Sequence, residues 1–347
     1  MGFFTKDIGI DLGTATVLIY VKGKGIVLRE PSVVSLDRDT GRVLKVGQEA
    51  LDMLGRTPDT IVAARPVQNG VIAEYELAEK LLRCCLAQVC SARITKPCVA
   101  VSVVEQVTEV EQRSFIEAVI SAGARRVTLV PETVAAAIGA GVDVSLPRGQ
   151  MLVNVGGGTV DVSVLSLKGE AVSSTVRVAG DAMDEAIVRY IRAQYGLIIS
   201  ESMAERLKIA IGCALPLEST LTAEAKGRDS MSGLPRSVMV SSDEICEAIR
   251  EPLQEILDTI AQVLEITPPE LAGDIIDTGL ILTGGLAQLR RLPDRLEQAT
   301  GIPCRVAENP AQCVAIGAGK ALQYSSSFSK VYDLGSFSYR LSDNVTN

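Results

Sequence analysis

The strongest constraint on the fold is a strand–glycine–strand pattern that occurs twice in the chain. The first copy is DIGIDLGTATVLIYV at residues 7–21, and the second is MLVNVGGGTVDVSVLSL at residues 151–167. In each copy an apolar run leads into a glycine-containing turn, and an alternating run follows the turn. Two related copies of one supersecondary unit predict two similar lobes.

The segments between and after these copies alternate strands and helices. CVAVSVV at residues 98–104 predicts a buried strand, and Thr108 with Glu111 forms a T-x-x-E capping box that opens the next helix. Helices dominate after the second copy until the strand GLILTGG at residues 279–285. This order predicts an α/β protein whose mixed sheets are flanked by helices.

Composition narrows the classes of function. The net charge of −8 argues against a nucleic-acid partner, because such proteins need a basic surface. The chain has no histidine, which excludes histidine-based nucleophiles and general bases. None of its eight cysteines forms a C-x-x-C pair, so we expect reduced thiols in a cytoplasmic protein. No apolar run reaches the roughly 20 residues of a membrane-spanning helix.

The two glycine turns are candidate phosphate sites. Glycine turns between strands can point backbone N–H groups at an anion, because no Cβ intervenes. A third strand–glycine junction, LTGGLAQL, lies at residues 282–289, and Asp11 is placed to hold Mg²⁺ through waters. Taken singly, each turn is more often a plain hairpin than a ligand site. The three together favour a nucleotide site, which either hydrolyses its ligand or only binds it.

Two polar positions have both a structural and a functional interpretation. Glu132 ends a strand and begins a helix, as active-site carboxylates do, although the helix dipole alone favours an acid there. Glu205 and Lys208 lie three residues apart on one helix face. They form either an exposed ion pair or a contact to the base and ribose of a nucleotide.

Five motifs carry a resemblance to a known family. They are GIDLGTA, VNVGGGTVDV, VAGDAMDEAI, AERLKIAIG and ILTGG. The order and spacing of these motifs resemble those of the actin-like ATPases and, among these, of the MreB bacterial actins. The resemblance covers about residues 6–323, which is nearly everything except the tail.

The resemblance implies an actin-like ATPase fold with two lobes, each having a core and a smaller outer subdomain, and a nucleotide in the cleft between the lobes. The implied boundaries are residues 1–32, 75–145 and 309–325 for subdomain IA, 33–74 for IB, 146–180 and 246–308 for IIA, 181–245 for IIB, and 326–347 for a flexible tail.

The resemblance also assigns roles to residues. Glu132, Thr159 and Asn154 match catalytic positions, with Glu132 orienting the attacking water, and Asp11 matches the position that holds Mg²⁺. The nucleotide-binding positions are Gly13, Thr14, Ala15, Thr16, Gly156, Gly157, Gly158, Glu205, Arg206, Lys208, Gly284, Gly285, Leu286 and Ala287.

Several of these positions depart from the family pattern. Asn154 stands where Asp is usual, and an amide cannot supply the negative charge that helps to place Mg²⁺. Thr16 and Val17 change the polar lining of the first turn, Leu286 replaces a glycine, and Pro131 replaces an acid. We expect binding to survive these changes better than hydrolysis, because backbone donors do most of the phosphate holding.

The resemblance implies an ATP-dependent, filament-forming protein with slow ATPase activity that scaffolds cell-wall synthesis and determines cell shape. Its expected cofactors are ATP and Mg²⁺. Its expected partners are further copies of itself in paired protofilaments, the membrane surface and membrane proteins of the cell-wall elongation machinery. A cytoplasmic location at the inner membrane face follows, with Phe3, Phe4 and Ile94 as the candidate membrane contacts. The alternative is a divergent nucleotide-binding scaffold with little or no hydrolysis.

Overall fold

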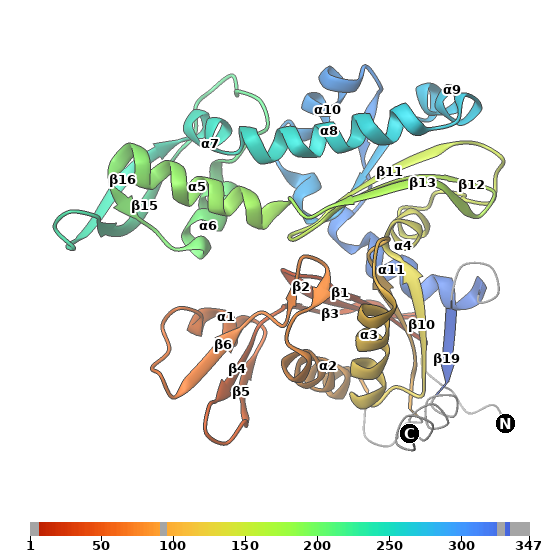
Figure 1. Cartoon of the computed structure of the whole chain (residues 1–347), viewed down its shortest axis with the longest axis horizontal. Helices are drawn as coiled ribbons and strands as arrows, with labels where there is room; N and C mark the ends of the chain where they lie inside the picture. The colour runs from red at the N-terminus through yellow and green to blue at the C-terminus, as the bar shows by residue number, and fades with distance from the viewer. Residues whose placement is uncertain (1–6, 91–95, 325–329, 334–347) are drawn as a thin grey trace. The chain divides into compact units, whose positions relative to one another are not determined.

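The chain folds into two compact units, and each has its own hydrophobic core (Figure 1). The computed structural model describes residues 7–90, 96–324 and 330–333. Unit 1 comprises residues 1–146, 166–170 and 312–347, and unit 2 comprises residues 147–165 and 171–311. The finer division into four subdomains stays a prediction.

Unit 1 contains one large and two small sheets. Its strands are β1 (Asp7–Leu12), β2 (Thr16–Val21), β3 (Gly25–Pro31), β4 (Val34–Asp37), β5 (Val43–Val46), β6 (Ile61–Ala64), β7 (Val67–Gln68), β8 (Val71–Ile72), β9 (Cys98–Val103), β10 (Arg126–Pro131) and β19 (Lys330–Asp333). Its helices are α1 (Gln48–Met53), α2 (Tyr75–Val89), α3 (Glu109–Ser121), α4 (Glu132–Gly139) and α11 (Cys313–Ala321), with the 3-10 turn η3 (Leu322–Tyr324) after them. The strand order of the large sheet is β19-β10-β9-β1-β2-β3.

Unit 2 contains a five-stranded sheet and a small three-stranded one. Its strands are β11 (Gln150–Val155), β12 (Val160–Ser166), β13 (Gly169–Val176), β14 (Leu197–Ile198), β15 (Thr222–Asp229), β16 (Pro235–Ser241), β17 (Leu280–Thr283) and β18 (Cys304–Val306). Its helices are α5 (Gly180–Tyr195), α6 (Glu201–Ile211), α7 (Ser242–Ala248), α8 (Arg250–Ile266), α9 (Pro269–Thr278) and α10 (Leu292–Thr300), with the 3-10 turns η1 (Gly285–Gln288) and η2 (Pro310–Gln312). The strand order of the larger sheet is β13-β12-β11-β17-β18.

The two large sheets share one local topology. β1 pairs antiparallel with β2 and parallel with β9, while β11 pairs antiparallel with β12 and parallel with β17. In both units the antiparallel pair is the strand–glycine–strand motif of the sequence. The repeat in the sequence is therefore a repeat in the structure. The predicted capping box is also present, since Thr108 accepts from Glu111 N and the Glu111 carboxylate accepts from Thr108 N.

Two elements differ from the sequence-based expectation. The sequence of residues 241–266 predicts one helix, but the chain forms α7 and α8 with Ile249 between them at φ −89°, ψ 3°. Pro252 has no N–H to donate to the preceding turn, so the new helix starts just before it. The tail was expected to be flexible, yet residues 330–333 form β19, which pairs antiparallel with β10 and covers its edge.

Glycines allow α11 to pack at backbone distance inside unit 1. A Cβ on Gly317 would lie 1.7 Å from the carbonyl oxygen of Ala135 in α4, and one on Gly139 would lie 1.8 Å from that of Cys313. On its other side, a Cβ on Gly9 of β1 would lie 2.3 Å from Gly319 N. The segment IGAGKA, which resembles the end of a phosphate-binding P-loop, is thus the packing surface of a helix.

We predict that Gly317→Ala destabilises unit 1 strongly, because the added methyl group has no space. Overpacking of this kind costs about 1–3 kcal/mol or more. The matched control is Gly273→Ala in α9, where a Cβ meets no atom within 4 Å. That change should raise the unfolding free energy by about 0.5–1 kcal/mol. Denaturant unfolding followed by circular dichroism tests both, and equal effects would contradict the packing argument.

Candidate functional site

The first glycine turn joins β1 to β2 in unit 1. Gly13 N donates to Thr16 O at 3.1 Å, which closes a four-residue turn. The N–H groups of Thr14 and Ala15 donate to no protein acceptor within the described part of the chain. The guanidinium of Arg65 binds the carbonyl groups of the turn. Its Nη1 donates to Thr14 O at 3.2 Å and to Ala15 O at 3.4 Å. The turn therefore holds two free backbone donors beside a fixed positive charge.

The second glycine turn joins β11 to β12 in unit 2 with the same geometry. Gly156 N donates to Thr159 O at 2.9 Å. A Cβ on Gly156 would lie 3.1 Å from Thr159 O, and a Cβ on Gly13 would lie 3.1 Å from Thr16 O. Among the described residues, no protein acceptor takes the N–H groups of Gly157 and Gly158. Unbonded N–H groups in a glycine turn are suited to an anion such as a phosphate.

Asn154 lies within the five-stranded sheet, one residue before the end of β11. It is 1% exposed, and its Oδ1 accepts from the Thr283 hydroxyl of β17 at 3.1 Å. On the other side it pairs in register with Asp161 of β12. Asp161 is 0% exposed and accepts from the Thr175 hydroxyl at 2.6 Å. The position expected to carry an acid is thus a neutral amide, and a buried carboxylate lies directly across the strand pair.

Asp11 occupies the position of β1 that matches Asn154 in β11. Its Oδ1 accepts from the Ser102 hydroxyl of β9 at 3.4 Å. Burial raises the pKa of Asp11 to about 7, and the Ser102 hydrogen bond opposes this shift. The structure describes no cluster of three or more His, Cys, Asp or Glu ligands in residues 7–90, 96–324 and 330–333. A single carboxylate with a neighbouring hydroxyl fits Mg²⁺ that is held mainly through its own waters and a phosphate.

Glu132 is the first residue of α4, directly after Pro131 ends β10. The next residue, Thr133, is fully buried and donates its hydroxyl to the carboxylate of Glu105 and, at 3.2 Å, to that of Glu170. The bond to Glu105 ties the start of α4 to the segment that follows β9. Glu132 therefore belongs to a helix terminus that is anchored by side-chain hydrogen bonds.

The three predicted nucleotide contacts on α6 have different environments. Arg206 is exposed, and its Nη2 lies 3.2 Å from Met203 Sδ. Glu205 is half-buried. Lys208 is buried, and its amine forms an ion pair with Asp184 of α5 at 2.7 Å. Burial raises the pKa of Asp184 to about 7, although the Lys208 charge opposes this. Lys208 is therefore not part of an exposed ion pair, and its contact to a nucleotide stays a prediction.

The third junction, Gly284–Ala287, is built differently from the two turns. Gly284 has φ +87°, and a Cβ there would lie 2.2 Å from Val155 O, so only glycine fits beside β11. The following residues form the short 3-10 turn η1. The side chains of Leu286 and Ala287 are buried in the core of unit 2. Only their backbone is available to a ligand.

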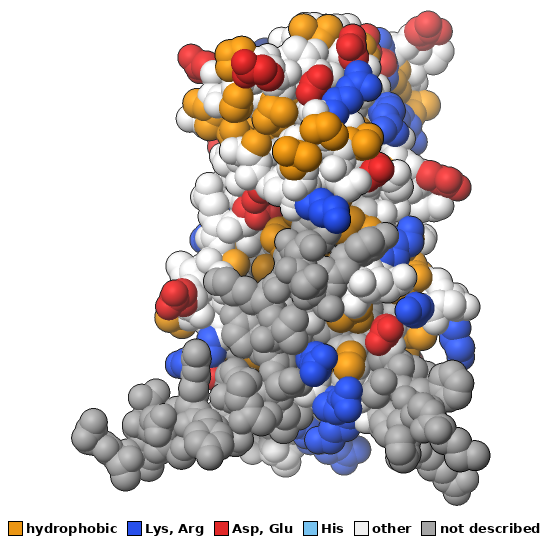
Figure 2. Space-filling model, turned by 90° about the vertical axis from the view of Figure 1, so that its right-hand side faces the viewer, with side chains coloured by type: hydrophobic (Ala, Val, Ile, Leu, Met, Phe, Trp, Pro, Cys, Tyr) orange, Lys and Arg blue, Asp and Glu red, His pale blue; other side chains and the backbone are white. Residues whose placement is uncertain are grey.

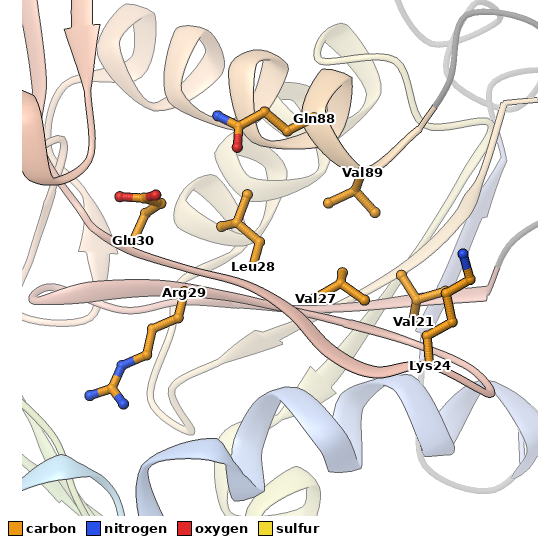
Figure 3. A pocket seen from close by; sticks show the side chains of 8 residues that line it. All are labelled: Val21, Lys24, Val27, Leu28, Arg29, Glu30, Gln88 and Val89. Carbon is orange, nitrogen blue, oxygen red and sulfur yellow. The ribbon is translucent and has the colours of Figure 1, made fainter.

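A pocket of about 450 Å³ in unit 1 lies between the edge strand β3 and the end of α2. Figure 3 shows Val27, Leu28, Gln88 and Val89 converging on it, with the guanidinium of Arg29 directed away from them. None of the predicted nucleotide-binding residues lines this pocket. It is therefore distinct from the glycine turns.

Phe3, Phe4 and Ile94, the candidate membrane contacts, lie outside the described residues. The helices of the described ranges include none with the length and apolar character needed to cross a membrane.

Two residues were missed by the sequence reasoning. Arg65 is separated from the first turn by about fifty positions, and nothing in its local sequence reveals that it would reach the backbone there. Asp161 belongs to VNVGGGTVDV, and its place opposite Asn154 follows from the hairpin register. Counting residues back from the turn would have identified it.

Comparison with known proteins identifies a family and relatives that are similar to this chain along most of its length. The sequence profile of the MreB/Mbl protein family matches residues 5–330. The cell shape-determining protein MreB of Escherichia coli (strain K12) is 49% identical over 328 residues, which cover 93% of this chain and 94% of that protein. The cell shape-determining protein Mbl of Bacillus subtilis (strain 168) is 47% identical over 320 residues, covering 92% and 96%.

Solved structures agree with this relationship. MreB5 of Spiroplasma citri bound to AMPPNP matches with a TM-score of 0.88 at 34% identity, covering 92% of this chain and 96% of that chain. A MamK double helical filament matches with a TM-score of 0.78 at 18% identity, covering 91% and 98%, which shows the shared fold alone. The predicted α/β, actin-like fold is confirmed. With a profile match over most of its length and relatives at nearly half identity, the chain belongs to the MreB/Mbl family of actin-like proteins.

Proposed function

We propose that this protein binds ATP with Mg²⁺ and assembles into filaments that scaffold cell-wall synthesis and determine cell shape. The observation that carries the proposal is the pair of matching glycine turns, each with unbonded backbone N–H groups. A relative at 34% identity has been solved with AMPPNP, and the same protein has been solved with ADP at 33% identity. We infer that both turns hold phosphate oxygens through their backbone.

The side chains have separable roles in this proposal. Thr14 and Thr159 add hydroxyl donors, Arg65 stabilises the negative charge near the first turn, and Asp11 holds the waters of Mg²⁺. When bound, Mg²⁺ neutralises charge on the phosphates. Glu132 orients a water toward the terminal phosphate, and its position at the anchored start of α4 suits that role. The mechanism is positioning and electrostatics, without a covalent intermediate.

Self-association is supported by exposed apolar side chains as well as by the family. Ile266 at the end of α8 is 60% exposed, and Ile276 in α9 is 66% exposed. Figure 2 shows hydrophobic side chains gathered on the upper part of one face, over the region of α9 in unit 2. Apolar side chains gathered at the surface are typical of contacts between protein chains. We propose paired protofilaments as the assembled state.

A second candidate function is a scaffold that binds nucleotide without hydrolysing it. Asn154 favours it, because its buried amide supplies no charge for Mg²⁺ and is held by the Thr283 hydroxyl. Under this alternative, filament assembly responds to ATP binding alone.

We predict that the purified protein sediments as filaments with ATP and Mg²⁺ but remains in the supernatant without nucleotide. Electron microscopy of the pellet should show paired filaments. The matched variant is Gly157→Val, because a branched side chain in the second turn obstructs the approach of phosphate to the backbone donors. Equal sedimentation of the parent and this variant, with or without ATP, would contradict the proposed site.

We predict that Asn154→Asp increases the rate of ATP hydrolysis. Restoring a charge that helps to place Mg²⁺ is expected to raise the single-turnover rate by about tenfold or more, as for other residues that orient a metal. Phosphate release in a single turnover measures this, with Thr283→Val as a control that only removes the hydrogen bond to Asn154. If the parent protein hydrolysed ATP as fast as Asn154→Asp in a single turnover, the hypothesis that Asn154 limits hydrolysis would be wrong.

Membrane association is proposed to depend on Phe3, Phe4 and Ile94, which also lie near charged residues in the sequence. We predict that Phe3→Ser/Phe4→Ser reduces flotation with liposomes, because two aromatic side chains no longer enter the interface. If the double variant floats as well as the parent protein, the hypothesis of an N-terminal membrane anchor is wrong. Flotation of an Ile94→Ser variant separates the contribution of the loop.

A further inference from the structure

The amine of Lys208 is a buried link between two helices of unit 2. Its Nζ donates to Gly180 O at 2.7 Å and to Asp184 Oδ2 at 2.7 Å. The side chain of Lys208 is 10% exposed and that of Asp184 is 7% exposed. The resemblance predicts an adenosine contact at Lys208, but the observed geometry uses two of its three N–H donors inside the protein.

The beginning of α5, where Lys208 binds, is also where the second glycine turn is attached. Asp181 N donates to Gly157 O at 2.8 Å, and Gly180 N donates to Gly156 O at 3.4 Å. A Cβ on Gly180 would lie 3.2 Å from Lys208 Nζ and 3.4 Å from Gly157 O. The start of α5 therefore contacts both the glycine turn and the Lys208 amine.

The electrostatics of this link favour a positional role over a stabilising one. A cation at a helix N-terminus opposes the helix dipole, so Lys208 depends on the Asp184 carboxyl. Asp184 Oδ1 is buried and has no hydrogen-bond partner in the described part of the chain. A buried pair with an unsatisfied oxygen contributes less stability than well-packed apolar side chains would. What the pair does supply is a fixed distance between α6 and the start of α5.

We propose that Lys208 is a positioning residue of the phosphate site, which holds the Gly156–Gly158 turn in its binding geometry through Gly180 and Asp184. This inference rests on the proposed ATP function. It moves the role of Lys208 from the nucleoside end of the ligand to its phosphate end. It also couples α6, which carries Glu205 and Arg206, to the phosphate turn through one amine.

The test compares two ligands, Mg·ATP and Mg·tripolyphosphate, which has no nucleoside. Each displaces a fluorescent ATP analogue from the parent protein and from Lys208→Met. Loss of an outer positioning contact weakens ligand affinity by about tenfold or more, and we expect that loss for both ligands. The control is Arg189→Met, which removes an exposed ion pair with Glu185 on α5 and should leave both affinities unchanged.

The outcomes separate the possibilities. Weaker ATP binding with unchanged tripolyphosphate binding would show a direct nucleoside contact and overturn the proposal. Unchanged affinity for both ligands would show a purely structural role and overturn it too, as would a parent protein that binds ATP but not tripolyphosphate. A parent that binds no ATP would instead refute the proposed function.

Lys208→Met leaves a buried Asp184 carboxylate without its partner, which destabilises the fold, so a second variant keeps the test decisive. Asp184→Asn/Lys208→Met removes both buried charges, and we expect it to fold with a melting temperature close to that of the parent. Its affinity for both ligands should still be reduced, because the link to Gly180 O is absent. Recovery of parent affinity in this folded double variant would contradict the positioning role.

Discussion

The backbone hydrogen bond that closes each glycine turn is the interaction on which the candidate nucleotide site depends. In both units the first residue of the turn donates to the carbonyl of the fourth, at 3.1 Å in one and 2.9 Å in the other. Closing the turn this way uses one donor and leaves the next two N–H groups without an internal acceptor. Those groups must be met by water or by a ligand, since an unpaired N–H in a buried setting is costly. The same geometry that ends one strand and begins the next therefore leaves two adjacent backbone donors for an anion, which is the basis of the proposed phosphate site.

Local patterns in the sequence were sufficient to predict the elements that depend only on residues close to one another in the chain. The turns, their flanking strands and the Thr108–Glu111 cap follow from apolar alternation and from the residues that turns and caps require. The division of residues 242–266 into α7 and α8 could have been predicted as well, since Pro252 is visible in the sequence. β19 is different, because a four-residue strand is only recognisable once the edge of β10 is known to need a partner.

The environments of the candidate site residues could not be predicted from the sequence where they depend on long-range contacts. Lys208 has the sequence environment of an exposed helical lysine, and only the placement of α5 shows that its amine is buried against Gly180 and Asp184. Arg65 likewise acquires its role from the approach of its segment to the first turn. Both are cations that donate to backbone carbonyls far from them in the sequence. Residue type and spacing do not encode that information.

Under the proposed function, the place of Asn154 lets nucleotide binding and hydrolysis change independently. The free N–H groups of the second turn belong to Gly157 and Gly158, and their orientation depends on the turn and on the start of α5. Asn154 lies in the strand before the turn and is held by Thr283, so its amide can replace an acid without moving those donors. The buried Asp161 opposite it adds a further reason for the amide, because two carboxylates in one register pair would repel each other in a site of low polarity. A neutral amide at position 154 avoids that repulsion, and under the proposed function Asp11 would then be the carboxylate that helps to place Mg²⁺.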